Sequence, residues 1–177
     1  MKRIETERLI LRNWSIDDLD DFYEYAKSKN IGPSAGWKPH SNKEESKKIL
    51  MSFIKADETW AIEYKENSKV IGSIGLHKDD MRTGVNSKML GYVLSEDYWG
   101  HGLITEASKA IINFAFNELN LDVLSVYHFR FNQKSKRVIE KCGFKYEGTL
   151  RRGNKLFDGT VVDLVCYSML KEEYYNK

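Results

Sequence analysis

Residues 89–119 constrain the fold of this chain more than any other part of the sequence. Strand-forming residues at 89–95 lead into a turn with two glycines, Trp99-Gly100-His101-Gly102. After the turn, apolar residues recur at intervals of three and four, which predicts one amphipathic helix over 102–119. The chain is therefore expected to combine the strands of a sheet with helices that pack beside it.

The rest of the chain alternates between predicted strands and helices. Further strands are expected at 8–13, 59–64, 70–77, 123–129, 144–150 and 161–170, and further helices at 16–26, 42–55 and 135–142. This order predicts a mixed α/β fold with one central sheet of seven strands and four helices. No linker or internal repeat marks a boundary, so residues 1–177 are expected to form a single domain.

Local signals refine the predicted elements. Ser41-Asn42-Lys43-Glu44 is typical of a capping box, in which Ser41 would cap the second helix. Gly143 predicts the end of the helix over 135–142, and Asp158-Gly159 predicts a hairpin turn between the last two strands. Two prolines and two glycines indicate a loop over 30–40.

Composition excludes several classes of protein. Apolar residues make up 41% and charged residues 31% of the 177 positions, and the net charge of +2 is too small to indicate a nucleic-acid partner. No apolar run approaches the ~20 residues of a membrane helix, and the opening residues lack an apolar signal region. We therefore expect a cytoplasmic protein without a membrane or nucleic-acid partner. In that reducing compartment Cys142 and Cys166 are expected to be buried thiols rather than a disulfide or metal ligands.

The glycine turn is suited to an anion. Unpaired amides at a helix start point outward, the helix dipole favours negative charge, and glycines let a phosphate approach the backbone. His101 could add a donor, although a plain turn without a ligand explains the same residues. A nucleotide triphosphate loop would end in Gly-Lys-Ser or Gly-Lys-Thr, whereas this turn continues Gly102-Leu103-Ile104-Thr105. A dinucleotide fingerprint would need a third glycine or alanine at the place of Thr105.

Four segments in order resemble one family. Tyr98-Trp99-Gly100-His101-Gly102-Leu103-Ile104-Thr105-Glu106-Ala107 resembles the cofactor motif of the GNAT superfamily of N-acetyltransferases. Asn132-Gln133-Lys134-Ser135, with Lys141-Cys142-Gly143-Phe144, is similar to the branch that acetylates the N-termini of ribosomal proteins. The opening Thr6-Glu7-Arg8-Leu9-Ile10-Leu11-Arg12 and the ending Asp163-Leu164-Val165-Cys166-Tyr167-Ser168 are similar too, so the resemblance spans nearly the whole chain.

The resemblance implies a fold and an activity. It implies a GNAT-like domain with a twisted, mostly antiparallel sheet, in which the strand over 89–95 splays from its neighbour after a bulge. It also implies transfer of an acetyl group from acetyl-CoA to a primary amine, by direct attack in a ternary complex. The pantetheine arm would pair with the backbone of Tyr92, Val93 and Leu94.

The resemblance also implies individual site residues. The turn that would bind the cofactor pyrophosphate comprises Trp99, Gly100, His101, Gly102, Leu103, Ile104 and Thr105. Asn132 would hydrogen-bond the pantetheine or the thioester, and Ser135 would lie near the sulfur and protonate the leaving thiolate. Two positions depart from the family: Ile104 is bulkier than the usual glycine or alanine, and Ile139 replaces a tyrosine that many members use as the acid. Ser135 is therefore the catalytic candidate, although it also fits as an ordinary hydroxyl early in a helix.

The reaction needs a neutral amine. At pH 7 a lysine amine with pKa ~10.4 costs about 4.6 kcal/mol to deprotonate, whereas an α-amine with pKa ~7.8 costs about 1 kcal/mol. An α-amine therefore needs little help from a base. His77, His128 and Glu106 are candidate bases by residue type. Each also has a structural interpretation: His77 as a strand histidine, His128 as a packing residue and Glu106 as an acid at a helix start.

The acceptor is the least determined partner. The loop over 31–40 carries Trp37 and His40 and is suited to recognition, and His77 could face the same substrate. Trp37 could instead only anchor the loop. Peptide N-termini and small-molecule amines both remain compatible, as do a monomer and a homodimer, and no metal is expected. The competing interpretation is a non-catalytic module that binds acyl-CoA as a sensor or partner protein.

Overall fold

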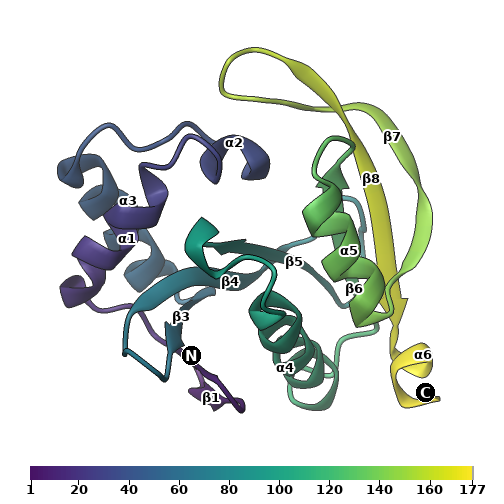
Figure 1. The fold of residues 1–177 in the computed structure, drawn as a ribbon. Coiled ribbons are helices and arrows are strands. Elements are labelled where there is room, and N and C mark those ends of the chain that lie inside the picture. Colours follow the sequence, from purple (N-terminus) through teal and green to yellow (C-terminus); the bar gives the residue numbers. More distant parts are fainter. Residues whose placement is uncertain (177) are drawn as a thin grey trace. The chain divides into compact units, whose positions relative to one another are not determined.

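The computed structural model describes residues 1–176, and they form a mixed α/β structure (Figure 1). Within these residues there are eight strands, six α-helices and two short 3-10 helices. In chain order the elements are β1 (Ile4–Glu5), β2 (Leu9–Arg12), η1 (Ile16–Asp18), α1 (Leu19–Ala26), α2 (Gly32–Ala35), α3 (Lys43–Ala56), β3 (Thr59–Tyr64), β4 (Val70–Lys78), β5 (Ser87–Leu94), η2 (Glu96–Tyr98), α4 (Leu103–Asn117), β6 (Val123–Phe129), α5 (Gln133–Cys142), β7 (Lys145–Lys155), β8 (Val161–Leu170) and α6 (Lys171–Tyr175).

The predicted mixed α/β class and all seven predicted strands are confirmed. β3 and β6 begin and end at the predicted residues, whereas β7 continues past residue 150 to Lys155. The sequence missed β1, α2 and α6, which contain two, four and five residues. Elements this short hold too few residues for a hydrophobic period to be visible. The segment over 30–40 is therefore not purely a loop.

The start of α3 lies one residue later than predicted. Asn42, not Ser41, is the N-cap, and its side-chain oxygen accepts from the Glu45 amide at 2.9 Å. The Glu45 carboxylate in turn accepts from the Ser41 amide at 2.6 Å. Asparagine and serine cap helices about equally well, so the sequence allowed both registers.

The described chain divides into two compact units, which we describe separately. The first unit comprises Met1–Gly75 and Tyr92–Ala107, and the second comprises Leu76–Gly91 and the chain from Ser108 onward. β4 and β5 each contribute residues to both units.

In the first unit, β1, β2, β3 and β4 pair in sequence order, and every pairing is antiparallel. The helices α1 and α3 pack against each other and bury an aromatic core. Trp14 and Phe22 meet edge to face in this core, with ring centroids 5.2 Å apart. The core explains the apolar spacing of α1, because Phe22, Tyr25 and Ala26 are all buried.

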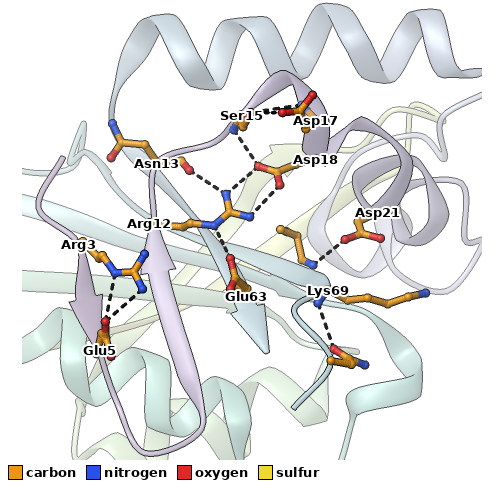
Figure 2. A network of polar contacts seen from close by, with 12 residues as sticks. Arg3, Glu5, Arg12, Asn13, Ser15, Asp17, Asp18, Asp21, Glu63 and Lys69 are labelled. Atoms are coloured by element: carbon orange, nitrogen blue, oxygen red, sulfur yellow. Dashed lines mark hydrogen bonds and ion pairs between the residues drawn. The ribbon is translucent and has the colours of Figure 1, made fainter. Parts of the chain in front are cut away.

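A charged network joins β2, η1 and β3 (Figure 2). The Arg12 guanidinium donates two hydrogen bonds to the Asp18 carboxylate, at 2.9 and 2.8 Å, and a third to Glu63. The Asp18 carboxylate also accepts from the Ser15 amide at 2.7 Å and completes a capping box at the start of η1. Hydrogen bonding to Asp18 raises the pKa of Arg12, so the guanidinium stays charged. Removing one member would leave a partly buried charge without its partner.

In the second unit, β5 pairs with β6 in parallel, and β6 and β7 each pair with β8 in antiparallel fashion. The pairing of β6 with β8 covers all of β6, from Val123 to Phe129. β7 and β8 form a long hairpin whose turn contains Gly159, with φ +89°, as predicted for Asp158-Gly159 (Figure 1). Cys142 is buried and Cys166 is half-buried, and both are free thiols. Across residues 1–176, no helix has the length and apolar character needed to cross a membrane.

Candidate active site

The glycine turn adopts a backbone that only glycine takes without strain. Gly100 has φ +86° and Gly102 has φ +78°, and α4 begins directly afterwards at Leu103. A β-carbon built on Gly100 would meet no atom within 4 Å, and one on Gly102 would meet only Nη2 of Arg8, at 3.8 Å. Both glycines and His101 are exposed. The space over the turn is therefore open to a ligand.

The backbone of this turn presents hydrogen-bond donors to that space. Among residues 1–176, no hydrogen bond uses the amides of residues 100–105 as donors, and the first paired amide of α4 is that of Glu106, which donates to the Gly102 carbonyl at 3.0 Å. Unpaired amides at a helix start, together with the helix dipole, attract anions. The residues present therefore fit a phosphate or pyrophosphate group.

Ile104 does not obstruct the turn. Ile104 is only 6% exposed and Leu103 only 2%, so the bulk of both residues lies away from the open surface. The departure from the family at Ile104 thus leaves the exposed backbone of the turn free of side-chain bulk.

Trp99, the residue before the first glycine of the turn, is anchored by a hydrogen bond and by packing. Its indole Nε1 donates to the Leu94 carbonyl at 2.9 Å, and its ring packs against the aromatic core of the first unit. These contacts connect the end of β5 to the turn within one unit.

Glu106, in the first turn of α4, accepts hydrogen bonds on both of its carboxylate oxygens. Glu106 accepts from the Thr6 hydroxyl at 2.6 Å, from the Arg8 amide at 2.8 Å and from the Arg8 guanidinium at 2.8 Å. Burial acts to raise the pKa of Glu106, but these hydrogen bonds outweigh it and hold the pKa below its ordinary value. Both carboxylate oxygens are already held by these contacts, so the geometry favours the structural interpretation of Glu106. Sequence reasoning missed its partners, Thr6 and Arg8, because they lie far away along the chain.

Only the first residues of β5 pair with β6. Its pairing with β6 covers Ser87 to Met89, whereas β5 itself runs to Leu94. Past its end, the Ser95 amide donates to the Ile71 carbonyl on β4 at 2.7 Å. Of the predicted pantetheine residues, Tyr92 and Val93 are half-buried and Leu94 is buried.

His77 lies against β5. A β-carbon built on Gly91 would meet the His77 imidazole at 3.1 Å, so the absence of a side chain at Gly91 makes room for this ring. His77 is half-buried. The His77 imidazole therefore packs against Gly91, the residue immediately before Tyr92.

Asn132 and Ser135 meet at the start of α5. The Asn132 side-chain oxygen accepts from the Ser135 amide at 3.0 Å, so Asn132 is the N-cap of this helix. Both residues are half-buried. The carboxamide oxygen of Asn132 therefore has a structural task that the sequence did not reveal.

The two acceptor-loop candidates differ in exposure. His40 is 7% exposed, its Nδ1 lies 2.7 Å from the Ser46 hydroxyl, and its ring meets Phe22 edge to face. Burial lowers the pKa of His40, against a smaller opposing effect of Glu45. These contacts favour a packing role for His40. Trp37 is half-buried beside the same core, so part of its ring stays accessible.

His128 also has the surroundings of a packing residue. It is 4% exposed on β6, and its Nδ1 lies 2.8 Å from the Phe129 carbonyl. Its Nε2 is buried and has no hydrogen-bond partner within residues 1–176.

Comparisons with known proteins agree with this geometry. The family model described as "Acetyltransferase (GNAT) domain" matches residues 8–145. The "Uncharacterized N-acetyltransferase p20" of Bacillus licheniformis is 27% identical over 98% of this chain and 99% of its own. The "Putative ribosomal N-acetyltransferase YdaF" of Bacillus subtilis is 38% identical over 61% of this chain and 57% of its own.

Two solved structures share the fold. A GNAT-family acetyltransferase from Bacillus anthracis superposes with a TM-score of 0.87 at 23% identity, covering 97% of this chain and 100% of its own. The microcin C7 self-immunity acetyltransferase MccE, solved with acetyl-CoA and AMP, superposes with a TM-score of 0.80 at 20% identity, covering 93% of each chain.

Proposed function

Because the chain belongs to the acetyltransferase (GNAT) domain family and is thus an acetyl-CoA-dependent N-acetyltransferase, we propose that it acetylates a primary amine by direct attack in a ternary complex. The observation that carries this proposal is the open start of α4, where glycines with positive φ leave the amides of residues 100–105 without acceptors. The pyrophosphate of acetyl-CoA is the anion that this cradle would bind.

We extend the cofactor site along β5. The end of the ladder with β6 at Met89 supports a role for the backbone of Tyr92, Val93 and Leu94 in pairing with the pantetheine arm. Trp99 and His101 belong to the proposed site through the turn that they help to form. The cofactor supplies the activated acetyl group as a thioester, and the chain binds and orients it.

The proposed chemistry has one bond formed and one broken. The amine nitrogen bonds to the thioester carbonyl carbon, the carbon–sulfur bond breaks, the sulfur gains a proton and the nitrogen loses one. Ser135 is the proposed donor of the proton to the sulfur, and Asn132 is the proposed partner of the pantetheine or thioester. The capped start of α5 supports this assignment because it holds both residues in fixed positions.

The proposed acceptor is an α-amine of a peptide or protein, or a small-molecule amine of similarly low pKa. Such an amine costs only about 1 kcal/mol to deprotonate at pH 7, so a single weak base suffices. His77 is the proposed residue on the acceptor side, supported by its position against Gly91, and Trp37 is the proposed contact from the loop. The similarity to YdaF, named as a putative ribosomal N-acetyltransferase, supports including ribosomal-protein N-termini among the acceptors. A cytoplasmic location and a monomeric or homodimeric state stay predictions.

The proposal is tested with a panel of acceptors. Purified protein and acetyl-CoA are incubated with peptides that begin with different residues, with free amino acids, polyamines and lysine-containing peptides blocked at the N-terminus. Thiol release and product mass are measured together. We expect acetylated product on at least one unblocked amine and little on blocked lysine peptides. Cofactor binding without turnover on any acceptor would instead favour the non-catalytic module.

A further inference from the structure

Arg8 reaches the glycine turn from the start of β2. Its Nη1 donates to the His101 carbonyl at 3.0 Å. Its Nε and Nη2 both lie 2.8 Å from one carboxylate oxygen of Glu106, and its own amide donates to the other at 2.8 Å. The Thr6 hydroxyl donates to that second oxygen at 2.6 Å. Residues 6–8 thus hold both a carbonyl of the turn and the acid in the first turn of α4.

The contact with His101 sets the direction of a peptide group. A loop that binds an anion through its backbone must turn its amides toward the ligand, and its carbonyls must then point elsewhere. The His101 carbonyl points to Arg8, so its partial negative charge is directed at a cation. Without this partner, the glycines on either side leave the peptide free to rotate, because both tolerate several backbone conformations.

The contact with Glu106 removes a competing charge. A carboxylate in the first turn of a helix interacts with the same positive helix end as a bound phosphate. The ion pair with Arg8 and the hydrogen bond from Thr6 occupy both oxygens of Glu106 and neutralise it. The turn then faces an anion with its amides and without a net negative charge beside them.

We propose that Arg8 is a positioning residue for cofactor binding, which fixes the His101 peptide and neutralises Glu106 so that the turn can accept the pyrophosphate of acetyl-CoA. The inference rests on the proposed cofactor site. It predicts an effect confined to ligands that carry the pyrophosphate.

The test compares two ligands on the full chain. Dissociation constants for acetyl-CoA and for S-acetylpantetheine, which lacks the pyrophosphate and the nucleotide, are measured by calorimetry. In Arg8→Ala we expect acetyl-CoA affinity to fall by about tenfold, since hydrogen bonds to charged groups are involved. Affinity for S-acetylpantetheine should stay within about twofold, and KM for acetyl-CoA should rise more than kcat falls.

Three variants separate charge from folding. Arg8→Lys keeps the charge but cannot make both contacts, so an intermediate loss is expected. Arg8→Ala combined with Glu106→Gln should recover part of the lost affinity, because the uncompensated carboxylate is gone. Arg3→Ala removes an arginine whose exposed ion pair is with Glu5, and it should change neither affinity. If Arg8→Ala does not fold, Arg8→Lys carries the same comparison.

The outcomes are distinguishable. Equal losses for both ligands, or no loss for acetyl-CoA, would overturn the role of Arg8 while leaving the cofactor site in place. If the unmodified protein binds acetyl-CoA no more tightly than S-acetylpantetheine, the proposed pyrophosphate site fails and the role of Arg8 fails with it.

Discussion

The helices α4 and α5 begin in opposite ways. At α5 the Asn132 side chain accepts from the Ser135 amide, so the helix closes its own end. At α4 the amides of residues 100–105 have no acceptor within the described chain. Glu106, in the first turn of α4, accepts a hydrogen bond from Thr6 and forms an ion pair with Arg8. A closed end contributes stability by itself. A helix end whose amides are unpaired leaves these donors available to a ligand, but it lacks the stability that a cap contributes.

The largest expected effect is at the open end. In Gly102→Val a β-branched residue is forced to φ +78°, so the turn must rearrange. We expect acetyl-CoA affinity to fall by roughly a hundredfold, which corresponds to about 3 kcal/mol. Gly84→Val is the matched control, because Gly84 has a similar φ of +75° and an added β-carbon there would meet no atom within 4 Å. Calorimetric affinities that are alike in the two variants would contradict a cofactor role for the turn.

The second effect is on turnover, at the closed end. Ser135→Ala keeps the backbone amide that Asn132 caps, so the fold of α5 should be unchanged. If Ser135 protonates the leaving thiolate, kcat should fall by about tenfold or more, with the dissociation constant of acetyl-CoA nearly constant. Steady-state kinetics and calorimetry on the same preparation measure both quantities. A normal kcat would remove the acid role of Ser135.

The third effect is on stability. Asn132→Ala removes the cap and should lower the free energy of unfolding by about 1 kcal/mol, measured by urea denaturation. Asn132→Asp restores an acceptor for the Ser135 amide and should regain most of that loss. If Asn132→Asp is stable yet binds acetyl-CoA weakly, the carboxamide has a second role toward the cofactor. Full affinity in a stable Asn132→Asp would limit Asn132 to capping.

The smallest effect is a pH dependence that only the open end should show. The folded-state pKa of Glu106 is lowered from 4.5, so its contribution to stability is present above that pH and is lost as the pH falls through the lowered value. Glu106→Gln should therefore be less stable than the unmodified protein at pH 7, by up to about 1 kcal/mol, and the difference should vanish in acid. α5 has no acid in its first turn, so the stability loss of Asn132→Ala should be the same at pH 7 and at pH 5. A Glu106 effect that did not vary with pH would contradict the ion pair.

The sequence predicted where both helices begin, but not how their ends differ. Glycines and the apolar period are local signals, and they placed α4 and α5 within a few residues. The cap of α3 shows the limit of such signals, since Ser41 and Asn42 are equally good caps and only the folded chain selects Asn42.

Individual side chains were harder to predict than elements. Trp37 and His40 share one loop, but His40 is buried against Phe22 and Ser46 while Trp37 remains partly accessible. Residue type and loop composition carry no information on which ring turns inward. In the same way, Glu106 was a candidate base by type, and its hydrogen bonds to Thr6 and Arg8 favour a structural role instead.

The sequence by itself determined the order of the elements, the glycine turn and the family of the chain, because positive φ, capping and hydrophobic period depend on neighbouring residues. The tertiary structure decided that the carbonyl of His101 faces Arg8, that Glu106 is neutralised and that the ladder of β5 with β6 ends at Met89. These features join residues far apart in the sequence. They arise only when folding brings the segments together, because a contact between distant residues leaves no periodic or local trace in either segment.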